Sequence, residues 1–137
     1  MNDLEISSSE RDTVLKLTGL VLQNGELVDY MVSLSQTGMS CKAKVCGYMS
    51  GGFAEYFRKL DRSIIEDGGW SGEQNWSSLE GEFDLVATSD SLGHVYLTVT
   101  LRSGYYDLDW MVKGGLLLEA QQLSDLAVKA TAAVKID

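Results

Sequence analysis

The chain has 137 residues, of which 45% are hydrophobic, and its formal net charge is −9. This length is typical of one domain whose core needs no disulfide or metal, so residues 1–137 are expected to form a single domain. The acidic charge argues against a nucleic-acid partner, because a phosphate backbone requires a basic surface; acidity instead keeps a protein soluble or attracts a basic partner.

The N-terminal residues, MNDLEISSSERD, are polar and contain no apolar signal-peptide core. No stretch of the chain approaches the ~20 apolar residues of a membrane span. We therefore expect a cytoplasmic protein that does not bind a membrane.

Three strands are predicted in the first half of the chain. Leu15 and Leu17 alternate with polar residues, and the two segments that follow alternate in the same way. Asn24-Gly25 predicts a hairpin turn, since both positions of such a turn can require positive φ. The expected strands cover residues 13–21, 26–35 and 40–48.

Cysteine and histidine are too few for a predicted metal site. Cys41 and Cys46 fall on the third expected strand, roughly 16 Å apart and on opposite faces. A disulfide needs Cα atoms within about 7 Å, so free thiols and a reducing compartment are expected. With His94 as the only histidine, the chain lacks a full set of zinc ligands, and we expect no metal and no cofactor.

Two amphipathic helices are predicted, one after each run of strands. Their apolar residues recur at offsets of three and four, which places them on one face of each helix. The helices cover residues 52–66 and 119–134, with stripes formed by Phe53, Tyr56, Phe57, Leu60 and Ile64 in the first and by Leu123, Leu126, Ala127, Ala130 and Val134 in the second.

The second half begins with a segment rich in Gly, Ser and Trp, residues 68–82. We expect an ordered loop here, in which Trp70 and Trp76 serve either as anchors or as a binding surface. A hairpin follows, from Phe83 through the turn TSDSLG to a strand at 94–102.

A third strand of the second run is expected around Leu108, Trp110 and Val112. These three residues alternate with Asp107, Asp109 and Met111, which predicts Trp110 in the core. Gly114-Gly115 is expected to interrupt this strand before a short one at 116–118.

The order of these elements predicts an α+β fold. It reads β-β-β-α, loop, β-β-β-α: an antiparallel sheet of about six strands in two three-stranded runs, each followed by a helix, with the helices on one face.

No catalytic set is recognisable. The sequence has neither a G-x-S-x-G nucleophile motif nor a G-x-G-x-x-G phosphate loop. His94 begins a strand on its polar face, and we expect it to form hydrogen bonds at the turn 89–93 rather than to act in catalysis. The chain is therefore expected not to be an enzyme.

A carboxylate pair leaves one alternative open. Asp107 and Asp109 share a predicted strand face, and Arg102 points to that face from across the hairpin. This arrangement is typical of an acid–base or substrate-binding cluster, or of charge pairing on a solvated sheet face.

The motifs FAEYFRKLDR, GGWSGEQNWSSLEGEF, LGHVYLTVTLR, DWMV and LLLEAQQLSDLA occur in that order over residues 50–127. In this the chain resembles a group of small bacterial proteins of unknown function, close in pattern to WapI-like immunity proteins of contact-dependent toxin systems. The resemblance implies a non-catalytic protein that binds and blocks a cognate toxin. An interface of carboxylates around an aromatic anchor would then use Trp70, Asp84, Tyr96, Asp107 and Asp109.

Two other roles remain open. A pocket lined by Trp70, Trp76, His94 and Tyr96 would make the chain a small-molecule-binding or enzymatic domain. Unprotected edge strands would instead allow homo-oligomers to form.

Overall fold

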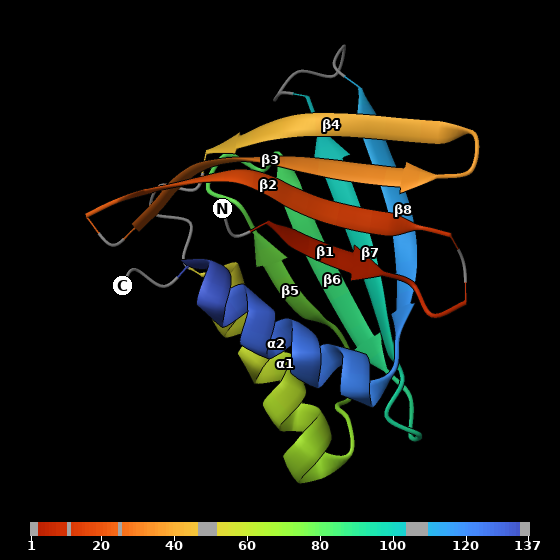
Figure 1. Cartoon of the computed structure of the whole chain (residues 1–137). Coiled ribbons are helices and arrows are strands. Elements are labelled where there is room, and N and C mark those ends of the chain that lie inside the picture. Colours follow the sequence, from red (N-terminus) through yellow and green to blue (C-terminus); the bar gives the residue numbers. More distant parts are fainter. Residues whose placement is uncertain (1–2, 11, 25, 47–51, 104–109, 135–137) are drawn as a thin grey trace.

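The computed structural model describes residues 3–10, 12–24, 26–46, 52–103 and 110–134. It contains two four-stranded antiparallel sheets, ordered β1-β2-β3-β4 and β5-β6-β7-β8, and two helices (Figure 1). The elements are β1 (Leu4–Ser7), β2 (Val14–Gln23), β3 (Glu26–Gln36), β4 (Met39–Cys46), α1 (Phe53–Asp67), β5 (Gln74–Ser77), β6 (Phe83–Ser89), β7 (Val95–Arg102), β8 (Met111–Leu118) and α2 (Ala120–Val134).

The α+β class, the antiparallel pairing and both helices are as predicted, but the layout of about six strands in two three-stranded runs is wrong. Each run gains one short strand. β1 lies in the polar N-terminal segment and pairs with β2, so that Ile6 faces Leu15. β5 lies inside the expected loop, where Trp76 pairs with Leu85 of β6. Both strands have four residues, too few to show a clear period of two.

The predicted interruption at Gly114-Gly115 is also wrong, because β8 runs without a break from Met111 to Leu118. Its backbone pairs with β7 throughout, with Gly114 opposite Val99 and Gly115 opposite Thr98. A central contact explains Gly114: a Cβ at this position would lie 2.9 Å from Cδ2 of Leu34 in β3. The glycine therefore lets the second sheet approach the first.

Trp110 is a second correction, since the structure leaves its side chain 42% exposed rather than in the core. Its carbonyl accepts a hydrogen bond from the Ser103 amide at 3.1 Å, beyond the last pair of the β7–β8 ladder. At that end of the hairpin, strand alternation no longer places a side chain over the core. Leu108, expected on the same face, lies outside the described residues.

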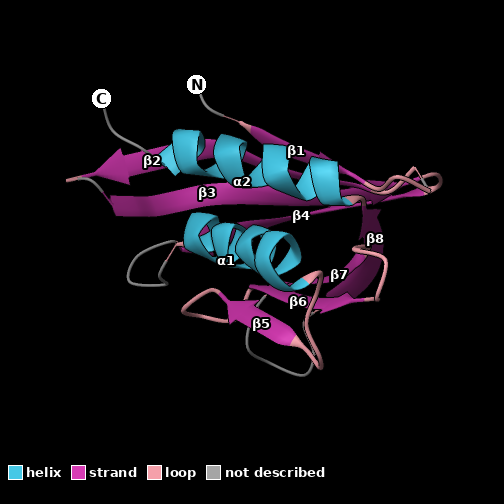
Figure 2. Ribbon diagram, turned by 90° about the horizontal axis from the view of Figure 1, so that it is seen from below, coloured by secondary structure: helices cyan, strands magenta, loops and turns pink. Residues whose placement is uncertain are grey.

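The core lies between the two sheets. Figure 2 shows both helices in the wedge between the sheets, where α1 and α2 pack together, rather than on one face of a single sheet. The predicted helix stripes are buried apart from their last residues, Ile64 and Val134, which are partly buried against the core. The Ser124 hydroxyl of α2 donates a hydrogen bond to Asp61 of α1 at 2.6 Å.

Aromatic side chains join the two halves of the chain. The Phe53 ring of α1 lies 5.8 Å from Tyr30 of the first sheet and 6.4 Å from Trp76 of the second, measured between ring centroids. Trp76 also meets Phe83 edge-on at 5.3 Å. Such tilted and edge-to-face pairs stabilise a core beyond the area they bury, and the partly buried Trp76 packs against the core through them.

A carboxylate joins the ends of the two sheets. Glu82 accepts a hydrogen bond from the Cys46 amide at 3.0 Å and another from the Ser78 hydroxyl at 2.7 Å. Cys46 and Cys41 are free thiols, as predicted. No helix in the described ranges is long and apolar enough to cross a membrane.

The two neighbouring glycines of β8 give a matched pair of stability variants. Gly114→Ala forces its new methyl group against Leu34, and we expect a loss of about 1–3 kcal/mol in the free energy of unfolding, as for an overpacked core. In Gly115→Ala the new Cβ meets no atom within 4 Å, so that variant should match the wild type. Urea denaturation measures both; equal midpoints for the two variants would contradict this account of sheet packing.

Candidate functional site

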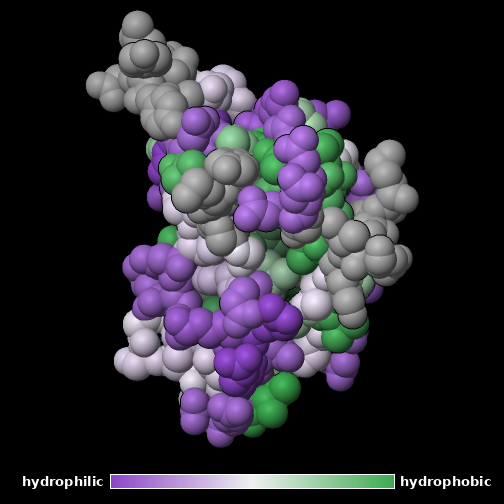
Figure 3. All heavy atoms as spheres, turned by 90° about the vertical axis from the view of Figure 1, so that its left-hand side faces the viewer, coloured by the Kyte–Doolittle hydropathy of each residue, from purple (hydrophilic) through white to green (hydrophobic). Residues whose placement is uncertain are grey.

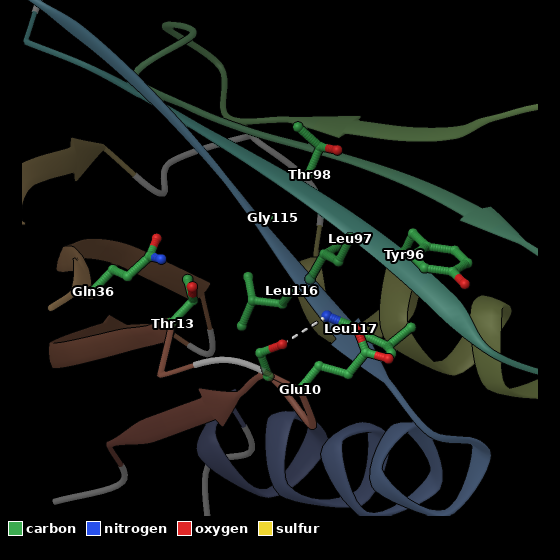
Figure 4. Close-up of a pocket in the computed structure, with 10 residues that line it drawn as sticks. Glu10, Thr13, Gln36, Tyr96, Leu97, Thr98, Gly115, Leu116 and Leu117 are labelled. Atoms are coloured by element: carbon green, nitrogen blue, oxygen red, sulfur yellow. Dashed lines mark hydrogen bonds between the residues drawn. The ribbon is translucent and has the colours of Figure 1, made fainter.

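A groove crosses the β8 edge where the two sheets meet. Its volume is about 360 Å³, within the range of small-ligand sites. Residues from the β1–β2 loop, the end of β3, and strands β7 and β8 line it (Figure 4): Ser8, Glu10, Thr13, Gln36, Tyr96, Leu97, Thr98, Gly115, Leu116 and Leu117. We call this the β8 groove.

Hydrogen bonds hold the walls of the β8 groove in place. The Ser9 amide donates to the Leu117 carbonyl at 2.8 Å, and the Leu117 amide donates to the Ser8 hydroxyl at 3.0 Å, the bond dashed in Figure 4. Ser8 also donates its own amide to the Thr13 carbonyl at 3.0 Å, which closes the β1–β2 loop. The groove is therefore formed before anything binds to it.

The groove contains open space beside a buried polar group. Gly115 is exposed and has no side chain, and no atom lies within 4 Å of where its Cβ would be. The Thr13 side chain is almost fully buried, with 2% of the residue exposed, and its hydroxyl has no hydrogen-bond partner among the described residues. A buried hydroxyl without a partner is costly, so Thr13 marks a place where a ligand atom would be favoured.

The groove presents one carboxylate and one aromatic ring to solvent. Among the described residues that line it, Glu10 is the only charged one, and it is exposed. Tyr96 is 48% exposed on the outer face of β7. A groove lined by both an aromatic ring and a carboxylate suits a cation, which each of them attracts.

His94 lies next to this site, two residues before Tyr96 on the same strand face. Its Nδ1 is 2.7 Å from Asp90 Oδ2, and its Nε2 is 3.2 Å from Glu119 Oε2. The other oxygen of Asp90 accepts the amides of Leu92 and His94, at 2.8 and 3.0 Å. The expected hydrogen bonding of His94 at the turn is confirmed, and the ring also links this turn to the start of α2.

These contacts shift two pKa values in opposite directions. The hydrogen bond to Asp90 is the main cause that raises the pKa of His94, helped by the negative charges of Asp90, Glu119 and Glu10. The same hydrogen bond lowers the pKa of Asp90. Because carboxylates contact both ring nitrogens, the surroundings of His94 favour the charged form of the imidazole.

Trp70 is an anchor of the loop before β5. Its indole Nε1 donates to the Ala87 carbonyl at 3.2 Å, and its amide donates to the Ser89 hydroxyl at 2.8 Å. Ser89 in turn donates to the Trp70 carbonyl at 3.1 Å. The preceding Gly69, with φ of 141°, allows this approach, because a Cβ there would lie 2.7 Å from the Ser89 hydroxyl oxygen.

The four residues suggested for a small-molecule pocket therefore do not meet in one place. Tyr96 lines the β8 groove and His94 lies beside it, whereas Trp76 packs against the core and Trp70 is bonded to β6. Neither tryptophan lines the β8 groove.

Asp84, another predicted interface residue, is engaged within the second sheet. It forms an ion pair with Arg102 and accepts a hydrogen bond from the Ser77 hydroxyl. Arg102 also donates to the Gly81 carbonyl at 2.9 Å. Asp107 and Asp109, the remaining candidates, lie outside the described residues.

Sequence reasoning missed Thr13, Glu10 and Gly115. The signal for Gly115 was present, since a glycine pair within an alternating strand marks a close backbone approach. In the parts of the chain that the structure describes, no three His, Cys, Asp or Glu residues form a potential metal site.

The model of a family of unknown function (DUF6228) matches residues 6–136, nearly the whole chain. Nothing in this match links the chain to WapI-like immunity proteins. No curated protein matches the chain.

The His94 contacts predict a pH-dependent contribution to stability. Because the pKa of His94 is raised in the folded state, its stabilising effect is fully present below the usual value of 6.5 and is lost as the pH rises through the folded pKa. Asp90 stays ionised in this window, since its pKa is lowered. His94→Gln should therefore destabilise the protein more at about pH 5.5 than at about pH 9. Urea denaturation at both pH values measures this difference, and an equal loss at both would contradict it. The same comparison in an Asp90→Asn background is the control: the difference should shrink, because the main cause of the raised pKa is removed.

The anchor of Trp70 predicts a strong effect at Gly69. Gly69→Ala places a methyl group against Ser89 at a backbone angle that side chains rarely adopt, so we expect a loss of about 1–3 kcal/mol in unfolding free energy. Ser89→Ala, which removes only the hydroxyl, should lose about 1 kcal/mol. Thermal unfolding followed by tryptophan fluorescence measures both variants. If Gly69→Ala unfolds at the wild-type temperature, the loop is not held as described.

Proposed function

Because the chain belongs to the DUF6228 family, whose function is unknown, we propose its role from its own surface: it is a non-catalytic domain that binds a basic partner protein. The observation that carries this proposal is the exposed ring of Tyr96 in the β8 groove, which the Glu10 carboxylate also lines. Asp90 and Glu119 add two more carboxylates next to it, held around His94.

The physical features of this surface favour protein recognition. Partly exposed tyrosines in a fixed setting are common among residues that dominate binding energy. A formal net charge of −9 speeds association with a positively charged partner. The loop beside Tyr96 is fastened to β8 by two hydrogen bonds, so little conformational freedom is lost on binding.

The finer form of the proposal is that the partner is a toxin, which this chain would neutralise. Its support is the sequence resemblance to WapI-like immunity proteins, together with the acidic charge. An acidic protein can cover the basic surface of a toxin that acts on nucleic acid.

A small-molecule role is the second candidate. The volume of the β8 groove and the unpartnered Thr13 hydroxyl favour it. The pocket would then be lined by Tyr96 with Thr13 and Gln36, next to His94.

Capture from the native host tests the proposal, with the tagged chain and its Tyr96→Ala variant as baits. Figure 3 shows that hydrophilic residues dominate the lower half of one face, where Figure 1 places the helices. The control is Ile65→Ala, which also truncates an exposed apolar side chain. Ile65 is 69% exposed on α1 and does not line the β8 groove. A basic protein recovered with the wild type and Ile65→Ala should fall at least tenfold with Tyr96→Ala, as for a hot-spot tyrosine.

Equal recovery by Tyr96→Ala would contradict the proposed surface. The toxin form of the proposal has its own readout: the captured partner expressed alone should stop growth, and co-expression of this chain should restore it. A partner that is harmless when expressed alone would remove the toxin role and leave the binding role standing.

A further inference from the structure

The hydrogen bonds of Leu117 reveal which way the backbone of β8 points. In an antiparallel strand, the N–H and C=O of one residue point to the same side, and this side alternates along the strand. The N–H of Leu117 bonds to the Ser8 hydroxyl and its C=O accepts the Ser9 amide. Both backbone groups of Leu117 therefore point away from β7. The β7–β8 register has no bulge, and Gly115 and Lys113 therefore direct their N–H and C=O to that same outer edge.

The outer edge of β8 is open at these two residues. Within the described ranges, no hydrogen bond from outside the sheet reaches Gly115 or Lys113. The Ser9–Leu117 bond thus has the geometry of the first hydrogen bond between β8 and a neighbouring strand, and the described residues supply no strand that continues the pairing. Figure 4 shows where the edge opens: Thr13 and Gln36 lie on one side of β8 and Tyr96 on the other.

The other sheet edges are less open. β4 carries two lysines, Lys42 and Lys44, whereas β8 carries one, Lys113, and lysines on an edge strand discourage pairing. β1 has four residues, and its Ser7 carbonyl accepts a hydrogen bond from Gln122 of α2 at 3.1 Å. β5 is equally short. Among the described strands, β8 combines length, a bare glycine and an adjoining groove.

We propose that the edge of β8 binds an extended segment of the partner protein as an added strand, paired with the backbone of Gly115 and Lys113. The segment would place a Lys or Arg side chain toward Glu10 and Tyr96, and a polar group against the Thr13 hydroxyl. This inference rests on the proposed protein-binding function and specifies the part of the partner that is recognised.

Charge identifies the occupant as a basic partner rather than a second copy. Each copy of this chain carries a formal net charge of −9, so pairing two β8 edges would bring like charges together. Among the described residues that line the groove, Glu10 is the only charged one, and its carboxylate attracts the opposite sign.

Two substitutions at Gly115 distinguish the effect on binding of losing the backbone N–H from that of adding a side chain. Gly115→Pro removes an N–H that faces the open edge, while the bonds of Gly114 and Leu116 to β7 remain. Gly115→Ala keeps the N–H and adds a Cβ that meets no atom within 4 Å. Thr13→Val removes only the unpartnered hydroxyl.

The probe is a peptide selected on the full-length wild-type chain from a random phage-displayed dodecapeptide library. We expect peptides with Lys or Arg at alternate positions. Their Kd, measured by fluorescence polarisation, should be weakened at least tenfold for Gly115→Pro and clearly less for Gly115→Ala, which keeps the N–H. Thr13→Val should weaken binding at least threefold. Hydrogen exchange should show the Gly115 and Lys113 amides fast in the free chain and at least tenfold slower with the peptide bound.

A second measurement needs no variant of the protein. Peptides N-methylated at single positions should lose binding to the wild type at alternate residues, as an added strand requires. The strand-addition model would be overturned if N-methylation had equal effects at successive residues, if amide exchange at Gly115 and Lys113 did not change, or if no peptide were selected. It would also be overturned if the wild type formed a dimer that Gly115→Pro dissociates. If the captured partner is lost with Tyr96→Ala but still binds Gly115→Pro, strand addition fails while the proposed function stands.

Discussion

The glycine pair of β8 is the constraint on which the packing and the candidate site both depend. Successive residues of a strand face opposite sides, so the two glycines act on different surfaces. Gly114 faces inward and leaves room for Leu34, which brings the two sheets into contact. Gly115 faces outward and leaves the β8 groove open. The same two glycines therefore allow the two sheets to pack together on one side of β8 and leave space in the β8 groove on the other.

The surroundings of this stretch are held by polar contacts from distant parts of the chain. The β1–β2 loop is bonded to Leu117, more than a hundred residues away in sequence. His94 joins the β6–β7 turn to the residue before α2 through two carboxylates. These contacts fix Tyr96 and Glu10 on opposite walls of one groove, which is the preorganisation that a recognition surface requires.

Much of the fold was predictable because it follows local patterns. The alternation of β2, β3 and β7 and the stripes of α1 and α2 gave the elements and their buried faces. The prediction failed where a pattern is short or conflicts with tertiary packing. β1 and β5 have too few residues to show a period, and Gly114-Gly115 is read as a break unless the opposing Leu34 is known. Trp110 keeps the alternation of its neighbours but lies beyond the end of the β7–β8 ladder.

The sequence by itself determined the class of elements, the free cysteines, the acidic charge and the place of His94 in a turn, since each depends on neighbouring residues or on composition alone. Only the tertiary structure decided that the strands form two sheets with the helices between them, and that Trp70 is bonded to β6 while Trp76 packs against the core. It also decided that Thr13, Glu10, Tyr96 and Gly115 share one groove. The reason is that these residues come from strands and loops more than a hundred positions apart, and their proximity arises from how the two sheets pack.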